Sequence, residues 1–272
     1  MPEKPSDLGF RQFQEDDRWG GSEVPLLRQR LEETIELIPA EARSILDVGC
    51  GSGNLVNRLC SDPSRYVVGV DSSNVALEHV RAHRICASGS ELPLQDKAFD
   101  IVLCCEVLEH LPDVMIQAFV GEMVRVSKRW ILVTVPYKEQ LLRSFTKCSQ
   151  CGHLFHVDGH IQSFTRDRLS QIMAPEFKAA ETHELTMAPR RHYSKLLTWV
   201  EKRLCHNYTI SRFAFCPKCG SRGLKQPSWW SKCYVLPRAV NRILNRRRKQ
   251  QGGHLAILFE RVGSMQDADR QT

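Results

Sequence analysis

The sequence lacks long apolar runs and an apolar N-terminus. No stretch of about 18 apolar residues occurs, which excludes a membrane-spanning helix. The opening residues 1–5, Met-Pro-Glu-Lys-Pro, contain none of the apolar run that a secretory signal needs. We therefore expect a cytoplasmic protein, in which the 11 cysteines do not form a disulfide framework.

Acidic residues are almost absent from one part of the chain. Residues 188–253 contain 16 Lys and Arg but a single acid, Glu201, and so carry a net charge of +15. The whole chain carries +7, which leaves −8 for the remainder. Such a basic segment predicts an anionic partner: the headgroups of a membrane surface, a phosphate-bearing small molecule or nucleic acid. No recognised nucleic-acid-binding module occurs, and a packed lid with a charged outer surface is the alternative.

Apolar strands and helical segments alternate from residue 44 onward. Strands are expected at 44–48, 66–70, 84–86, 99–104 and 130–135, then within 177–187 and over 254–260. Helices are expected at 24–38, 53–60, 74–82, 114–127 and 165–173. This alternation predicts an α/β fold built on a doubly wound parallel sheet with helices on both faces. We expect an N-terminal cap over residues 1–40, a core of residues 41–187 and 254–263, and an insertion over residues 188–253.

A glycine-rich loop follows the first expected strand. The residues 47–53 read Asp-Val-Gly-Cys-Gly-Ser-Gly, and the helix expected after them would offer its free N–H groups to a ligand. Asp71 ends the second strand, where a carboxylate can accept hydrogen bonds from ribose hydroxyls. The arrangement is typical of a nucleotide-type cofactor site. A dinucleotide site would read G-x-G-x-x-G, so a nicotinamide dehydrogenase is the weaker alternative.

Further segments carry a resemblance to a known family. They are residues 68–71, Val-Gly-Val-Asp; residues 89–94, Gly-Ser-Glu-Leu-Pro-Leu; and residues 106–113, Glu-Val-Leu-Glu-His-Leu-Pro-Asp. With the loop, they resemble the class I S-adenosylmethionine-dependent methyltransferases across residues 40–187 and the last strand. The resemblance implies a Rossmann-like sheet, S-adenosylmethionine as the methyl donor, and a cofactor site made of Asp47, Gly49, Cys50, Gly51, Gly53, Asp71, Ser72, Ser88, Gly89, Cys105 and Glu106. Ser88 departs from the Asp that many relatives carry there.

Two histidines are the candidates for a general base in methyl transfer. His110 follows the fourth strand, and His160 precedes a helix in a segment that often faces the acceptor in the family. Residues 106–110 also resemble the ubiquinone-biosynthesis O-methyltransferases, which implies that Glu106, Glu109 and His110 can engage a divalent cation such as Mg²⁺. The alternatives are local pairing of Glu109 and His110, and a histidine at position 160 that faces solvent or a zinc site.

Two C-x-x-C-G elements predict a metal site. They contain Cys148 and Cys151, then Cys216 and Cys219, and four thiolates suit a tetrahedral structural Zn²⁺. The two pairs are unusually far apart, so the metal would join residues 148–160 to the basic insertion, which we expect to form a lid over the acceptor pocket. Replacement of one thiolate by His153 or His156, and a redox-active pair, are the alternatives.

These features predict an S-adenosylmethionine-dependent methyltransferase that acts on a hydroxyl of a small molecule or glycan. Similar zinc-knuckle methyltransferases imply a role in natural-product or surface-polysaccharide biosynthesis. One alternative is a nucleic-acid methyltransferase that uses the basic insertion as a clamp. Another is a non-catalytic protein that binds the cofactor and is held together by zinc. Peripheral contact with an anionic membrane is expected from the basic, amphipathic character of the insertion.

Overall fold

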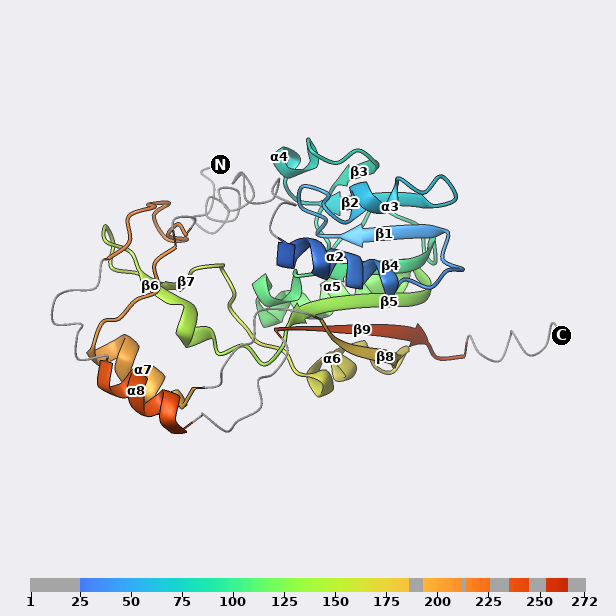
Figure 1. Ribbon diagram of the computed structural model, residues 1–272. Helices are drawn as coiled ribbons and strands as arrows, with labels where there is room; N and C mark the ends of the chain where they lie inside the picture. The colour runs from blue at the N-terminus through green and yellow to red at the C-terminus, as the bar shows by residue number, and fades with distance from the viewer. Residues whose placement is uncertain (1–24, 186–192, 212–213, 226–234, 245–252, 264–272) are drawn as a thin grey trace. The chain divides into compact units, whose positions relative to one another are not determined.

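The computed structural model describes residues 25–185, 193–211, 214–225, 235–244 and 253–263 (Figure 1). The chain forms two compact units. The larger unit contains described residues 25–138, 164–185 and 253–263, and the smaller one contains 139–163, 193–211, 214–225 and 235–244. The predicted cap is therefore described only from residue 25. The arginine clusters at 190–191 and 246–248 lie outside the described residues.

A seven-stranded sheet is the centre of the larger unit. Its strand order is β3-β2-β1-β4-β5-β9-β8. The first five strands pair in parallel, whereas β9 runs antiparallel to both of its neighbours. The strands are β1 (Ser44–Val48), β2 (Tyr66–Asp71), β3 (His83–Cys86), β4 (Phe99–Cys105), β5 (Ser127–Pro136), β8 (Phe177–Leu185) and β9 (His254–Arg261). The α/β class and all seven strands of the sequence prediction are confirmed.

Helices cover both faces of this sheet. They are α2 (Pro25–Glu36), α3 (Val56–Leu59), α4 (Asn74–Leu77), the 3₁₀ turn η2 (Leu108–His110), α5 (Asp113–Val126) and α6 (Arg166–Met173). Along β1, Leu46 and Val48 join a core shared with α5 and α6, whereas Ile45 joins a second core shared with α2 and α3. This alternation is what a strand buried on both faces requires, and it makes the sheet doubly wound.

The helices after β1 and β2 are shorter than predicted. The expected helix 53–60 is regular only over α3, because Gly53 adopts a φ of +78°, outside the helical region. The expected helix 74–82 ends with α4 at Leu77. There the Arg84 guanidinium donates to the carbonyls of Leu77, Glu78 and Val80, which lie at the end of α4 and just beyond it.

The smaller unit is built from two excursions of the chain away from the sheet. The first, between β5 and α6, contains the 3₁₀ turn η3 (Leu141–Ser144) and the antiparallel hairpin of β6 (Phe145–Lys147) and β7 (Leu154–His156). The second, between β8 and β9, contains α7 (Lys195–Trp199), the π-helical segment η4 (Val200–Leu204) and α8 (Val235–Leu244). A small core of Cys148, Phe155, Val157, Ala214 and Cys216 joins the two excursions.

Membrane-spanning helices were also sought in the described part of the chain. None of its helices combines the length and apolar character needed to cross a bilayer.

Candidate functional site

The direction in which strands are added to the sheet reverses between β1 and β4. The chain places β2 and β3 on one side of β1, then returns to place β4 on the other side. In doubly wound sheets, ligands bind outside the carboxyl ends of the strands at such a reversal. The glycine loop follows β1 and Glu106 follows β4, so both predicted cofactor segments lie at this edge.

The glycine loop is held in a conformation that only glycine adopts freely. Gly49, Gly51 and Gly53 have φ angles of +82°, +52° and +78°. The N–H groups of Gly49 and Cys50 both donate to the Val70 carbonyl, at 2.8 and 3.0 Å, which fastens the loop to β2. A Cβ at Gly49 would lie 2.5 Å from Val107 Cγ2, whereas no described atom lies within 4 Å of a Cβ at Gly51. The loop is therefore packed at Gly49 and open at Gly51.

Asp47 carries a carboxyl group at the end of β1. The residue is 3% exposed, and its Oδ1 atom has no hydrogen-bond partner among the described residues. Burial, together with the neighbouring charge of Asp71, raises the pKa of Asp47 to about 7. An unsatisfied buried carboxyl oxygen is costly, so this atom is suited to receive a donor from a ligand.

Asp71 is oriented by the glycine loop itself. Its Oδ2 accepts the Gly51 N–H at 2.9 Å and its Oδ1 accepts the Ser73 N–H at 2.9 Å. The carboxylate is thus fixed at the end of β2, where ribose hydroxyls bind in folds of this kind. Among the other predicted cofactor residues, Ser72 and Ser88 are exposed. Gly89 lies against Phe119, whose ring a Cβ at this position would overlap.

The two cysteines predicted to contact the cofactor are poor nucleophiles. Burial raises the pKa of Cys50, and the charges of Asp47 and Asp71 raise it further. Burial and the charge of Asp47 also raise the pKa of the Cys105 thiol well above its ordinary value. Both side chains therefore stay protonated at neutral pH and contribute shape rather than thiolate chemistry.

Glu106 is the centre of a polar network that the sequence analysis did not foresee. Its Oε2 lies 3.0 Å from Arg30 Nη1 of α2 and 2.6 Å from His254 Nε2 at the start of β9. Its Oε1 accepts the Thr134 hydroxyl of β5 at 3.1 Å. His254 is 3% exposed, and its Nδ1 atom has no hydrogen-bond partner within the described ranges. The network joins four elements of the larger unit at the carboxyl edge.

The predicted base His110 lies in the larger unit, in η2. Its ring and the Glu109 carboxylate offer donor atoms within 4.8 Å of each other. Glu106, the third member of the predicted Mg²⁺ set, is instead paired with Arg30 and His254. The predicted cation site at these three residues stays a prediction.

The other predicted base, His160, lies in the smaller unit beside a buried acid. Its Nδ1 is 2.5 Å from Glu139 Oε2, and the rings of His160 and His156 stack with centroids 4.6 Å apart. Burial alone would raise the pKa of Glu139, but contacts with His156 and His160 hold it well below its ordinary value. Glu139 is therefore a carboxylate that orients the His160 ring. Nothing in the sequence around Glu139 marks this acid as part of a site, so it was not predicted.

The four predicted metal-ligand cysteines come together in the smaller unit. Cys148 Sγ lies 3.6 Å from Cys219 Sγ, and Cys151 Sγ lies 3.5 Å from Cys216 Sγ. All four Sγ atoms lie within 4.8 Å of one another, and none is in a disulfide. A tetrahedral Zn²⁺ with Zn–S bonds of about 2.3 Å needs sulfur atoms about 3.8 Å apart. The donor set and its spacing thus fit this ion.

Comparison with known sequences finds methyltransferases. A family of methyltransferase domains matches residues 45–129. The ubiquinone biosynthesis O-methyltransferase of Albidiferax ferrireducens is 34% identical over 95 residues, covering 31% of this chain and 37% of that protein. The tRNA N(3)-cytidine methyltransferase METTL2 of Gallus gallus is 28% identical over 171 residues, covering 54% and 46%. The chain thus spans less than half the length of these two relatives.

Solved structures with the same fold include methyltransferases. The N-methyltransferase NodS from Bradyrhizobium japonicum, solved with S-adenosyl-L-homocysteine, gives a TM-score of 0.55 at 12% identity over 96% of this chain and 100% of that one. A chain of the complex between the Haloferax volcanii Trm112 methyltransferase activator and the putative methyltransferase gives 0.57 at 15% identity, covering 92% and 96%. At these identities the likeness concerns the fold alone. Residues 45–129 thus match a methyltransferase domain, and the larger unit has the fold of S-adenosylmethionine-dependent methyltransferases.

Proposed function

We propose that this protein transfers a methyl group from S-adenosylmethionine to a hydroxyl of a small molecule or glycan. The observation that carries the proposal is the pairing of an open cradle at Gly51 with the unsatisfied Oδ1 of Asp47. Both belong to one loop at the carboxyl edge of the sheet. The methyl donor carries an ammonium group, ribose hydroxyls and a sulfonium, which are the donors and the positive charge that such a site is built to receive.

When bound, S-adenosylmethionine supplies a methyl group on a positively charged sulfur, which is already a good leaving group. The protein then has to bind and align. Gly51 keeps the cradle free of a side chain, Asp47 accepts a hydrogen bond at Oδ1, and Asp71 accepts hydroxyl donors while it stays fixed by Gly51 and Ser73. Such positioning is the main source of rate in a reaction whose leaving group needs little activation.

An O-methyl acceptor also benefits from a base that receives its proton. His110 and His160 are both proposed for this role. For His160, the short contact with Glu139 favours a proton on Nδ1 and a lone pair on Nε2, the tautomer that a base acting through Nε2 requires. A shift of the pH–rate profile in His160→Gln or His110→Gln, measured with saturating methyl donor, assigns the base.

Calorimetric binding of S-adenosylhomocysteine tests the cofactor site. We expect the wild-type protein to bind it. Gly51→Val places a side chain in the cradle and Asp71→Ala removes an acceptor, so each should lower the affinity by about 100-fold. The matched control is Gly121→Ala, because a Cβ at that position in α5 meets no described atom within 4 Å. Wild-type protein that fails to bind the ligand, or binding that survives both substitutions, would remove the proposal.

A nucleic-acid acceptor is the second candidate. It is favoured by the sequence match to a tRNA methyltransferase and by the +15 charge of residues 188–253. Incubation of cell extract with methyl-labelled S-adenosylmethionine separates the two candidates. Label in low-molecular-mass or glycan fractions supports the first. Label in RNA or DNA, with binding that weakens steeply as salt rises, supports the second.

We also propose a structural Zn²⁺ on Cys148, Cys151, Cys216 and Cys219. Four thiolates leave no open coordination position, so the ion stabilises the fold rather than activates a water molecule. Burial alone would raise the pKa of Cys148, but the N–H groups of Cys151 and Gln150 lower it to about 7, whereas burial raises the pKa of Cys216 to about 12. Binding of the metal would therefore release a proton from Cys216. The role of the smaller unit as a lid, and its contact with anionic membranes, stay predictions.

A further inference from the structure

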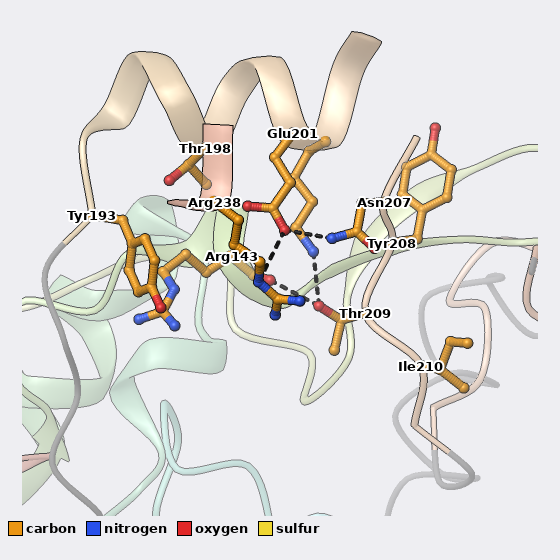
Figure 2. A pocket seen from close by; sticks show the side chains of 10 residues that line it. Arg143, Tyr193, Thr198, Glu201, Asn207, Tyr208, Thr209, Ile210 and Arg238 are labelled. Carbon is orange, nitrogen blue, oxygen red and sulfur yellow. Dashed lines mark hydrogen bonds and ion pairs between the residues drawn. The ribbon is translucent and has the colours of Figure 1, made fainter. Parts of the chain in front are cut away.

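The smaller unit contains a cavity of about 360 Å³ (Figure 2). This volume lies within the range of small-molecule sites and is far larger than a single inorganic ion. Both excursions of the chain contribute to its wall. The lining residues are Arg143, Tyr193, Thr198, Glu201, Lys202, Asn207, Tyr208, Thr209, Ile210 and Arg238.

Three cations face this cavity, against one acid. Arg143 comes from η3, Lys202 from η4 and Arg238 from α8, and Glu201 supplies the carboxylate. Figure 2 shows Arg238 and Asn207 both directed at the Glu201 carboxylate. The Arg238 contact is a loose ion pair of 3.9 Å. The acid is thus engaged by an amide and one guanidinium, and the wall keeps a net positive charge.

Among the described residues, no carboxylate forms an ion pair with Lys202. The residue is only 6% exposed. Its ammonium donates to Thr209 Oγ1 at 2.9 Å and to the Phe145 carbonyl at 3.5 Å. Burial lowers the pKa of Lys202 to about 8, and the charges of Arg238 and Arg143 act in the same direction against that of Glu201. A buried cation with only neutral acceptors is costly unless an anion joins it.

The rest of the wall offers hydrogen-bonding groups. Thr198 is 4% exposed, and its Oγ1 atom has no hydrogen-bond partner in the described segments. The Tyr193 ring lies over the Arg143 guanidinium, 3.9 Å from its central carbon, which holds that cation in place. A ligand suited to this wall needs hydroxyl groups as well as negative charge.

We propose that this cavity binds a small hydroxylated molecule that carries a phosphate or carboxylate group, with its oxyanion on Lys202 and Arg238. A phosphate monoester and a sugar acid share this chemistry. The site lies wholly within the smaller unit and goes beyond methyl transfer. Its binding can be measured without a methyl donor, so failure here leaves the proposed methyltransferase activity untouched.

The test is calorimetry on the full-length protein with four probes: glucose 6-phosphate, glucuronate, glucose and inorganic phosphate. We expect glucose 6-phosphate or glucuronate to bind about tenfold or more tightly than both glucose and inorganic phosphate. Tighter binding of glucose 6-phosphate identifies the oxyanion as a phosphate, and tighter binding of glucuronate identifies it as a carboxylate. We expect Lys202→Met to lower that affinity about tenfold or more, because it removes the buried cation.

Arg238→Met is the second variant, because its side chain is 55% exposed and its loss should leave the fold intact. It should weaken binding about threefold or more, whereas Arg242→Met, one turn further along α8 and outside the cavity wall, should leave it unchanged. The proposal is overturned if neither acid binds at about 10 mM. It is also overturned if inorganic phosphate binds as tightly as glucose 6-phosphate, or if both Lys202→Met and Arg238→Met bind the ligand as tightly as the wild-type protein does.

Discussion

Asp47 gives the cofactor site a measurable pH dependence. Its ordinary pKa of 3.8 is raised to about 7 in the folded protein. Between these values the folded protein keeps a proton that the unfolded chain has lost, so the free energy of unfolding falls as pH rises from about 4 to about 7. Asn at this position does not titrate. From pH 4 to pH 8, Asp47→Asn should therefore gain roughly 4 kcal/mol of stability relative to wild type, while it loses affinity for S-adenosylhomocysteine.

Urea unfolding of the ligand-free protein at pH 5, 6, 7 and 8 measures this difference. Asp100→Asn is the control, because the pKa of Asp100 is lowered in the folded protein whereas that of Asp47 is raised. Burial opposes the shift, but hydrogen bonds from Ser44, Lys128 and Arg43 lower the pKa of Asp100 to about 2. Its stabilisation is present above pH 4 and is lost as pH falls toward 2, so Asp100→Asn should cost about 2 kcal/mol at pH 7. A stability difference between Asp47→Asn and wild type that is constant with pH would contradict the prediction.

Within the glycine loop, substitutions at Gly49 and Gly51 should have different effects: one on stability and the other on ligand binding. At Gly49 a Cβ would lie 2.5 Å from Val107 Cγ2, so Gly49→Ala should destabilise the fold by about 2–3 kcal/mol. At Gly51 only the φ of +52° opposes a side chain, which costs about 1 kcal/mol. Gly51→Ala should instead act mainly by lowering the affinity for the ligand. Paired urea unfolding and calorimetry on both variants test this, and an equal loss of stability in the two would show that the cradle at Gly51 is not open.

Helix α2 is joined to the carboxyl edge of the sheet by Arg30. Its ion pair with Glu106 is 3.0 Å long, and the two side chains are only 17% and 19% exposed. Arg30→Ala should therefore lower the free energy of unfolding by about 2 kcal/mol, since it removes an ion pair from the largely buried carboxylate of Glu106.

Arg28 on the same helix provides the matched control. It pairs with Glu32 one turn away, but these side chains are 64% and 49% exposed. Arg28→Ala should change stability by about 0.5 kcal/mol or less. Urea unfolding at neutral pH measures the loss of stability in Arg30→Ala and in Arg28→Ala. Equal losses in the two variants would mean that the Glu106 network does not stabilise α2.

Sequence patterns predicted this sheet well because strand burial is a local property. A strand covered on both faces reads as a continuous apolar run, as residues 44–48 and 130–135 do. The lengths of α3 and α4 were overestimated, because they depend on the φ of Gly53 and on Arg84, which follows α4 in the chain. The pairing of Arg30 with His254 joins residues 224 positions apart, and no local pattern encodes such a contact. The cavity around Lys202 was missed for the same reason.

On the scale of the whole molecule, the chain leaves the sheet twice and builds one smaller unit from both excursions. The two cysteine pairs belong to different excursions, with 64 residues of chain between Cys151 and Cys216. Backbone hydrogen bonds also cross this junction: the N–H groups of Ser149, Lys225 and Thr209 donate to the carbonyls of Gly223, Lys147 and Phe145, at 2.9, 2.7 and 3.0 Å. Folding closes this long loop at a large cost in chain entropy. A metal bound by both cysteine pairs offsets that cost and so stabilises the folded unit.

Removal of the proposed metal should therefore affect the two units unequally. The protein purified without chelator should hold about one zinc per chain, and Cys148→Ser or Cys219→Ser should lose it, while Cys60→Ser keeps it. After chelation, hydrogen exchange should accelerate in residues 145–157 and 205–225 but not in residues 44–48 and 99–105. Affinity for S-adenosylhomocysteine should change by less than about twofold, because the cradle belongs to the larger unit. Exchange that accelerates equally in both units would show instead that the four thiolates stabilise the sheet as well.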